Sequence, residues 1–253
     1  MLTLEVAILS ERGGRKYNED ACGYWSSERQ VCCVLADGAG GHGGGDVASR
    51  LAVRSLLAGF AAAPSASGSE LSRLMRQTNQ AVLDGRIAGG VQQDMHTTIV
   101  CLVIDFFDGR ADWAHSGDSR LYWFRDRRLM ERTRDHSFVE SLVDAGVIRE
   151  DETRAHPERS VLLSALGKED DELELTASLS SRVVSGGDVF LLCSDGVWEY
   201  LTDGLLEQLL AQATSPKKWL AAIEHAIREA TRDLASHDNY TALTVWLGGA
   251  AEV

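Results

Sequence analysis

Two apolar segments of this sequence each end on an Asp-Gly pair. Asp37 and Gly38 follow the segment Val31–Ala36, and Asp195 follows Val189–Ser194 in the same way. A carboxylate at the end of a buried strand is costly unless positive charge meets it. No Lys or Arg is adjacent to either Asp in the sequence. If these strand ends converge in space, a hard cation is the simplest positive partner.

Three more acids stand next to expected strands. Asp238 lies immediately before the last apolar run, and Glu19 and Asp20 follow a polar loop after the first. Oxygen-only ligands without Cys or His spacing favour Mg²⁺ or Mn²⁺ over Zn²⁺. Such a cluster could hold two cations bridged by a water of lowered pKa. Taken singly, each Asp-Gly pair is better explained as an ordinary turn, and only several acids at strand ends together favour a metal site.

The order of expected elements favours an α+β fold with antiparallel pairing, because strands and helices are segregated rather than strictly alternating. Alternating or β-branched runs predict strands over Thr3–Ser10, Gln30–Ala36, Thr97–Ile104, Arg110–Ser116, Ser119–Arg125, Asp188–Ser194 and Asn239–Leu247. Helical spacing predicts helices over Asp46–Phe60, Glu70–Gly85, Phe138–Asp144, Leu205–Ala213 and Trp219–Leu234. The runs on either side of Gly117 and Asp118 resemble a hairpin. The simplest architecture is two packed sheets, a β-sandwich, with helices on their outer faces.

Composition limits the class of protein. The 253 residues are 44% hydrophobic, enough for a full core, and we expect one domain over 1–253 with its core at about 4–247. The formal charge of −13 argues against binding nucleic acid or an anionic membrane. The five cysteines are odd in number and include an adjacent pair, which favours a reducing compartment. With neither a signal peptide nor a run of about 18 apolar residues, the expected location is the cytoplasm.

Three other features leave alternatives open. The run Gly38–Gly43 formally matches a dinucleotide-binding loop, but Asp37 would repel a pyrophosphate and the expected ribose-binding acid is missing. Arg15 could clamp a phosphate bidentately or could be a solvated loop residue. His42 is the best-placed histidine for an acid role, although a structural role is favoured for each histidine near these loops.

Together these segments resemble the metal-dependent Ser/Thr protein phosphatases of the PPM family, also called PP2C, from about Leu4 to Trp246. The matching motifs occur in the family's order, and their spacing is specific. They are Arg15-Lys16-Tyr17-Asn18-Glu19-Asp20, Ala36-Asp37-Gly38-Ala39-Gly40-Gly41-His42, Thr97-Thr98, His115-Ser116-Gly117-Asp118-Ser119-Arg120, Cys193-Ser194-Asp195-Gly196 and Asp238-Asn239. The stretch from Asp135 to Gly167 resembles the bacterial branch, in which it includes a flap over the site (about 135–167).

The resemblance implies a binuclear Mn²⁺ or Mg²⁺ centre between the two sheets. By motif, Asp37 would bridge both ions and the Gly38 carbonyl would bind one of them. The other implied ligands are Asp195 and Asp238 at the metal pair, Glu19 and Asp20 through water, and Asp118 with Asp195 for a third, weaker ion. Arg15 would hold the substrate phosphate. The position after Asp37-Gly38 is Ala39 rather than the histidine of some eukaryotic members, so His42 and a metal-bound water are equal candidates for the proton donor.

The activity that this resemblance implies is hydrolysis of phosphoserine and phosphothreonine in proteins by a metal-bridged hydroxide. Phosphoprotein substrates and an opposing bacterial Ser/Thr kinase are the expected partners, and we expect a monomer. The alternative is a catalytically weak, phospho-dependent regulatory module of the same fold.

Overall fold

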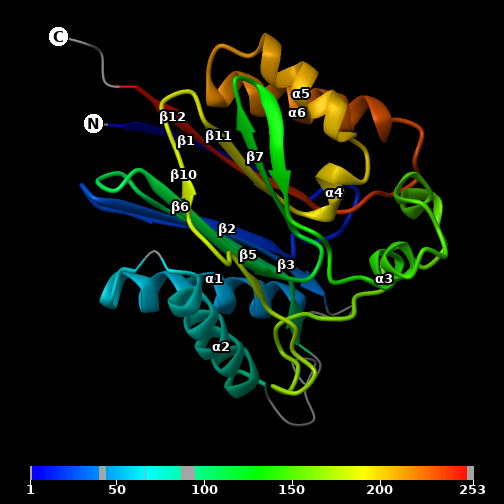
Figure 1. Ribbon diagram of the computed structural model, residues 1–253. Coiled ribbons are helices and arrows are strands. Elements are labelled where there is room, and N and C mark those ends of the chain that lie inside the picture. Colours follow the sequence, from blue (N-terminus) through cyan, green and yellow to red (C-terminus); the bar gives the residue numbers. More distant parts are fainter. Residues whose placement is uncertain (1, 40–43, 66, 87–94, 250–253) are drawn as a thin grey trace.

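The computed structural model describes residues 2–39, 44–65, 67–86 and 95–249 of the chain, which form two stacked β-sheets with helices on both outer sides (Figure 1). This arrangement confirms the expected α+β sandwich. His42 and the part of the glycine-rich run from 40 to 43 lie outside the described residues. No helix in the described ranges is long and apolar enough to cross a bilayer.

The first sheet joins the two ends of the described chain. It has five strands in the order β1-β12-β11-β7-β8, and each neighbouring pair is antiparallel. The strands are β1 (Thr3–Glu11), β7 (Arg120–Arg125), β8 (Arg128–Arg132), β11 (Val189–Cys193) and β12 (Tyr240–Gly248).

The second sheet has seven strands. Its main path is β10-β6-β5-β3-β2, with β4 beside β3 and β9 beside β6, again in antiparallel pairs. The strands are β2 (Asp20–Ser26), β3 (Gln30–Ala39), β4 (His96–Thr97), β5 (Ile99–Asp105), β6 (Arg110–Ser116), β9 (Thr176–Ala177) and β10 (Arg182–Val183).

Helices cover the outer face of each sheet. In Figure 1, α1 and α2 lie along the second sheet, whereas α5 and α6 lie over the first. Two short helices, α3 and α4, and a 3₁₀ turn, η1, lie near the end of the sandwich where β3 ends. The helical segments are α1 (Gly45–Ala62), α2 (Gly68–Asp84), α3 (Phe138–Asp144), η1 (Glu150–Ala155), α4 (Asp195–Trp198), α5 (Asp203–Gln212) and α6 (Pro216–Ala230).

Strand β3 shows why the apolar runs are continuous. Val31, Cys33 and Leu35 face the core between the sheets. The alternate residues Cys32 and Val34 face the core beneath α1 and α2. Because side chains alternate across a strand, a strand covered on both faces needs apolar residues at every position. The same packing keeps both cysteines as free, fully buried thiols.

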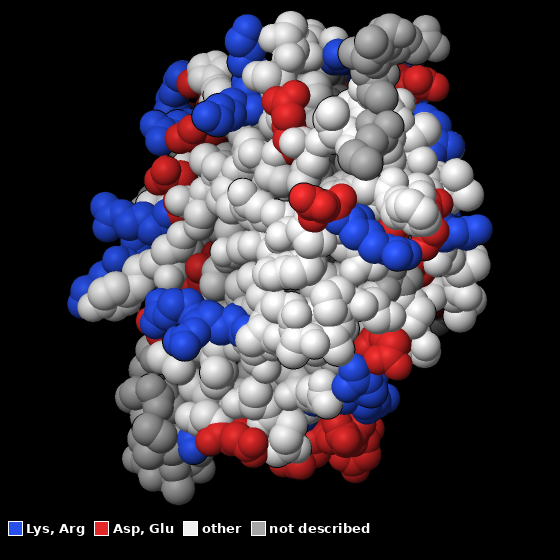
Figure 2. Space-filling model, turned by 90° about the vertical axis from the view of Figure 1, so that its left-hand side faces the viewer, with Lys and Arg blue, Asp and Glu red and all other residues white. Residues whose placement is uncertain are grey.

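The face of the molecule shown in Figure 2 has no concentration of Asp and Glu, although the chain has more acidic than basic residues. There, Lys and Arg alternate with Asp and Glu around the edge, and the centre is largely free of charged side chains. This face is the left-hand end of the sandwich in Figure 1, away from α3 and α4. It therefore offers no large single-sign patch for a polyanion or a charged membrane.

Most predicted elements are confirmed, but one connection was wrong. The runs on either side of Gly117 do not form a hairpin, because β6 and β7 belong to different sheets. Gly117 has a φ of 97°, a left-handed conformation suited to glycine, at the point where the chain crosses between the sheets. The strand pattern could not distinguish a crossing from a hairpin because both need a turn.

Helix and strand boundaries also shift. The last helix starts earlier than predicted, at Pro216, because the Ser215 side chain accepts a hydrogen bond from the Lys218 N–H and caps it. Strand β2 was not predicted at all. It carries Asp20 at its first residue, so this acid lies on a strand rather than in a loop.

Candidate metal centre

The acids predicted from the sequence meet at the end of the sandwich where β3 ends. Asp37 and Asp20 are register partners on β3 and β2. A cavity of about 210 Å³ opens beside them. Its lining consists of Arg15, Glu19, Asp37, Gly38, Ala39, Thr98, Asp118, Ser160, Leu162, Asp195, Asp238 and Asn239. Seven of the eight predicted site residues line this cavity, and the eighth, Asp20, lies next to Asp37.

Backbone contacts hold Asp37 in place. The Asp37 N–H donates to Thr98 Oγ1 at 3.0 Å, and the Asp37 carbonyl accepts from the Thr98 N–H at 2.9 Å. Thr97 Oγ1 also donates to the Asp37 carbonyl, at 2.8 Å. Both threonines are buried, so these bonds are shielded from competing water. The result is a carboxylate on a rigid strand rather than on a flexible turn.

Gly38 lies where three chain segments pass very close to one another. A Cβ at this position would lie 2.2 Å from the Gly45 carbonyl oxygen and 2.7 Å from that of Glu19. The Gly38 N–H donates to the Glu19 carbonyl at 3.2 Å. Only glycine allows this approach, which brings the start of α1 and the end of the loop before β2 against Asp37.

Asp195 and Asp118 are close in sequence to strands of the first sheet, β11 and β7. Asp195 is the first residue of α4, directly after β11, and Asp118 lies in the crossing between β6 and β7. Trp198, at the other end of α4, donates its indole N–H to the Asp118 carbonyl at 2.9 Å. One turn of helix therefore fixes both acids relative to each other.

Burial and mutual repulsion dominate the electrostatics. Burial raises the pKa of Asp20 to about 6 and that of Asp118 to about 7. Burial also raises the pKa of Asp37 and of Asp195 well above the usual range, and neighbouring carboxylates raise both further. Among the described residues, none of these four acids forms an ion pair with Lys or Arg. Without added cations the cluster therefore holds its negative charge at a high energetic cost.

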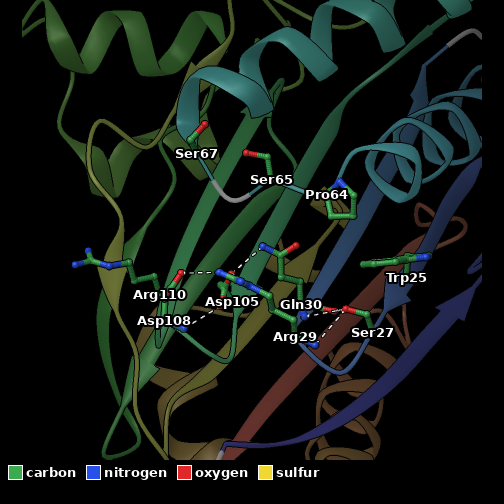
Figure 3. A pocket seen from close by; sticks show the side chains of 10 residues that line it. All are labelled: Trp25, Ser27, Arg29, Gln30, Pro64, Ser65, Ser67, Asp105, Asp108 and Arg110. Atoms are coloured by element: carbon green, nitrogen blue, oxygen red, sulfur yellow. Dashed lines mark hydrogen bonds and ion pairs between the residues drawn. The ribbon is translucent and has the colours of Figure 1, made fainter.

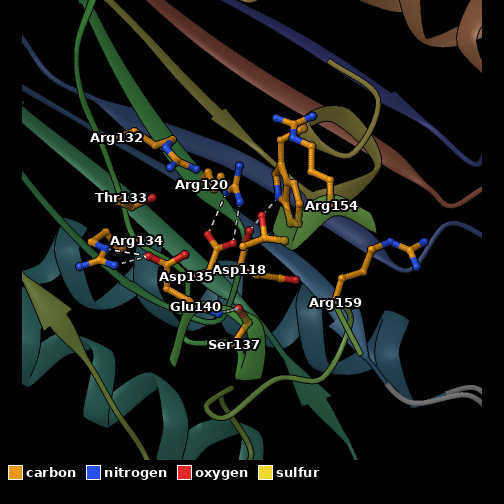
Figure 4. A network of polar contacts seen from close by, with 12 residues as sticks. Asp118, Arg120, Arg132, Thr133, Arg134, Asp135, Ser137, Glu140, Arg154 and Arg159 are labelled. Atoms are coloured by element: carbon orange, nitrogen blue, oxygen red, sulfur yellow. Dashed lines mark hydrogen bonds and ion pairs between the residues drawn. The ribbon is translucent and has the colours of Figure 1, made fainter. Parts of the chain in front are cut away.

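Arg120 lies close by and lowers the pKa of Asp118, but less than burial and the charge of Asp135 raise it. Its guanidinium forms two hydrogen bonds to Asp135, at 2.9 and 2.7 Å, in a pair that is almost fully buried (Figure 4). One face of the same guanidinium stacks on the Trp198 ring, with Arg120 Cζ 3.7 Å from the ring centroid. Because Asp135 takes the bidentate contact, Asp118 has no ion-pair partner within the described part of the chain.

Arg15 contacts one of the acids directly. Its guanidinium pairs with Asp238 at 2.7 Å, so Asp238 does have a basic neighbour, although none is adjacent in the sequence. The Arg15 side chain is 57% exposed and the Asp238 side chain 36%. An exposed ion pair of this kind is weak, and a cation or a phosphate could displace either partner.

The donor set fits hard divalent cations. The buried oxygens Asp20 Oδ1 and Asp195 Oδ1 have no hydrogen-bond partner among the residues that the structure describes, although buried polar atoms in proteins almost always have one. In the ranges that the structure describes, no three His, Cys, Asp or Glu side chains are already spaced to hold an ion. A coordination shell here would therefore include the Gly38 carbonyl and water, which Mg²⁺ and Mn²⁺ readily accept.

A larger cavity lies elsewhere and has different chemistry. It has a volume of about 720 Å³ and opens below the loop between α1 and α2 (Figure 3). Its buried carboxylate, Asp105, accepts hydrogen bonds from Arg29 and Gln30 and from two backbone N–H groups. Because these hydrogen bonds, one of them from the Arg29 guanidinium, compensate the charge of Asp105, this carboxylate does not need a bound cation.

Several residues at the centre were not singled out by sequence reasoning. Thr98, Ser160, Leu162 and Asn239 line the cavity, and Trp198 supports it. Thr98 and Asn239 stand inside the motifs that were recognised, next to residues with obvious chemistry. Ser160 and Leu162 come from the predicted flap, where no pattern in the sequence distinguished them.

Comparison with known proteins agrees with this geometry. The family model for Protein phosphatase 2C matches residues 10–237. The chain is 33% identical over 235 residues to the serine/threonine protein phosphatase PstP of Mycobacterium tuberculosis, a match that covers 90% of this chain and 43% of PstP. It is 30% identical over 249 residues to the serine/threonine phosphatase stp of Listeria monocytogenes, covering 96% of this chain and 95% of the relative.

A solved structure shares the fold. The catalytic domain of PstP in complex with two manganese ions superposes with a TM-score of 0.80 at 28% identity, over 98% of this chain and 100% of that one. The chain spans less than half of the full-length PstP sequence. By the extent of the family match and by its relatives, the chain belongs to the Protein phosphatase 2C family.

Proposed function

We propose that this protein hydrolyses phosphoserine and phosphothreonine in proteins with the help of Mn²⁺ or Mg²⁺. The observation that carries the proposal is the convergence of Asp37, Asp118 and Asp195 at one cavity, with Asp20 beside Asp37. No basic side chain among the described residues pairs with any of these four acids. The family relationship supports the same reading, since relatives of this chain are named serine/threonine phosphatases.

The proposed ligands divide between the two sheets. Asp37 and the Gly38 carbonyl, on the second sheet, would hold two ions together with Asp195 and Asp238. Glu19 and Asp20 would act through water, and Asp118 with Asp195 would hold a third, weaker ion. When bound, such cations activate water for attack on phosphorus and neutralise the charge that develops on the phosphoryl oxygens.

Arg15 would bind the substrate phosphate. Its planar guanidinium can hold two phosphoryl oxygens at once, which orients the phosphorus for in-line attack. In the structure it pairs with Asp238, so substrate binding would require it to exchange this carboxylate for the phosphate. A second cavity, of about 470 Å³, shares Arg15, Asp195 and Asp238 with the first and offers room for residues that flank the phosphorylated side chain.

The substrates and the partner are inferred from the relatives of this chain. Phosphoproteins would be the substrates, and an opposing Ser/Thr kinase would be the partner. We also propose a cytoplasmic location, a monomer, a single domain over 1–253 and a flap over about 135–167. The proton donor would be His42 or a metal-bound water.

The direct test is turnover of p-nitrophenyl phosphate and of a phosphothreonine peptide with and without Mn²⁺. We expect activity with Mn²⁺, loss on chelation and recovery when the ion is restored. Asp37→Asn should remove activity, whereas Asp170→Asn, at a side chain that is 73% exposed, should not. A folded wild-type protein that binds the phosphopeptide without hydrolysing it would instead favour the regulatory module.

A further inference from the structure

The loop between β1 and β2 carries two proposed functional residues but has no regular structure of its own. It runs from residue 12 to residue 19 and includes Arg15 and Glu19. Within it, the Arg15 N–H reaches the Arg12 carbonyl at 3.1 Å. Most of the support that places this loop must therefore come from other parts of the chain.

Asn239 supplies much of that support. Its side-chain NH₂ group donates to the Arg12 carbonyl at 2.8 Å and to the Tyr17 carbonyl at 2.9 Å. Its Oδ1 accepts from the Glu19 N–H, also at 2.8 Å. The residue is only 5% exposed, and both N–H groups and the oxygen of the amide are engaged. No other amide orientation satisfies two carbonyls and one N–H together.

These contacts hold the loop on both sides of Arg15. The carbonyls of Arg12 and Tyr17 flank the arginine, and Glu19 follows directly after them in the loop. Asp238, the neighbour of Asn239, pairs with Arg15 and accepts a hydrogen bond from the Asn239 N–H at 2.8 Å. Asn239 therefore holds the loop at a fixed distance from Asp238.

We propose that Asn239 is a positioning residue, which holds the loop 12–19 so that Arg15 faces the phosphate and Glu19 faces the cations. This inference rests on the function proposed above. It predicts that Asn239 acts on substrate binding through Arg15, not merely on the stability of the fold.

The first test uses metal-free protein and does not depend on activity. Trypsin can cleave after Arg12, Arg15 and Lys16, and a released loop is the better substrate. Asn239→Asp keeps the acceptor for the Glu19 N–H but loses both donors, and Asn239→Ala removes the contacts without adding charge. We expect both variants to be cut within residues 12–17 about tenfold faster than the wild type, the scale of one or two lost hydrogen bonds.

Asp105→Ala provides the matched control. Asp105 is also buried, and it holds a loop at the other cavity by accepting from the Phe107 and Asp108 N–H groups at 3.0 and 2.9 Å (Figure 3). This variant should lower the melting temperature without faster cleavage within 12–17. Equal cleavage of the wild type and both Asn239 variants would overturn the proposal.

The second test is a double-mutant cycle on the Mn²⁺-loaded protein. Asn239→Ala and Arg15→Ala should each raise the KM for p-nitrophenyl phosphate about tenfold, with smaller changes in kcat. If Asn239 acts through Arg15, the double variant should have the KM of Arg15→Ala alone. Fully additive effects would refute the positioning role. An inactive wild type that nevertheless shows the expected cleavage pattern would instead refute the proposed function.

Discussion

Neutralising Asp118 should stabilise the metal-free protein. Asp118 is 5% exposed, and burial, followed by the charge of Asp135, raises its pKa to about 7. Asp118→Asn keeps nearly the same shape and removes the charge. Because the Asp118 carboxylate forms no ion pair among the described residues, the substitution removes its repulsion with neighbouring acids and breaks no ion pair.

The size of the effect follows from linkage. The difference between a folded-state pKa of about 7 and the ordinary value of 3.8 corresponds to about 4 kcal/mol at a pH above both. Because the folded pKa is the higher one, the folded protein binds more protons, and its stability falls as the pH rises. The destabilisation caused by the Asp118 carboxylate is complete above about pH 7 and becomes smaller as the pH falls towards 4. Asp118→Asn should therefore raise the free energy of unfolding by about 4 kcal/mol at pH 8 and by about 2 kcal/mol at pH 5.

Urea denaturation in the presence of EDTA, at pH 5 and pH 8, measures this difference. Asp170→Asn serves as the control, since its side chain is 73% exposed and its free energy of unfolding should change by less than about 0.5 kcal/mol. If Asp118→Asn is no more stable than the wild type at pH 8, or gains equally at both pH values, the electrostatic description of the cluster is wrong.

Three other predictions concern the cations and the packing. Mn²⁺ at a hundred times its Kd should raise the free energy of unfolding by about 2.7 kcal/mol in the wild type, seen as a higher melting temperature, and by clearly less in Asp37→Asn. Gly38→Ala should cost about 1–3 kcal/mol and abolish Mn²⁺-dependent turnover, because its Cβ would lie 2.2 Å from the Gly45 carbonyl; wild-type turnover would contradict this crowding. Leu35→Ala should cost about 2–5 kcal/mol in urea denaturation, since this side chain is fully buried between the sheets, and a loss below 1 kcal/mol would be incompatible with that packing.

Much of the candidate site was predictable because its chemistry is local in the sequence. Asp37 and Asp195 each end a continuous apolar run, and such a run predicts a strand that is buried on both faces. A carboxylate at the end of such an apolar run marks the end of the sheet where charge is concentrated. This reasoning locates the acids, but their convergence depends on which strands pair, and strand pairing is a property of the whole chain.

The parts that escaped prediction are those whose role depends on contacts with distant residues. Asn239 has no unusual local sequence, yet its amide reaches three backbone groups more than two hundred residues away. Thr98 is one of many β-branched residues in its run, and only the fold brings its hydroxyl to Asp37. The pairing of Arg15 with Asp238 likewise joins two loops that no periodicity relates.

The pairing of β1 with β12 has a consequence for how the chain is made. Thr3 aligns with Gly248 and Glu11 with Tyr240, so β1 can pair with its neighbour only after all the strands and helices between β1 and β12 have been synthesised. Contacts this remote in sequence close slowly, and an unpaired strand edge can meanwhile join the wrong partner. During synthesis, Asp37 and Asp238 can therefore come together only after the residues that lead into β12 have been made, and the partly folded chain exposes an unpaired strand edge until then.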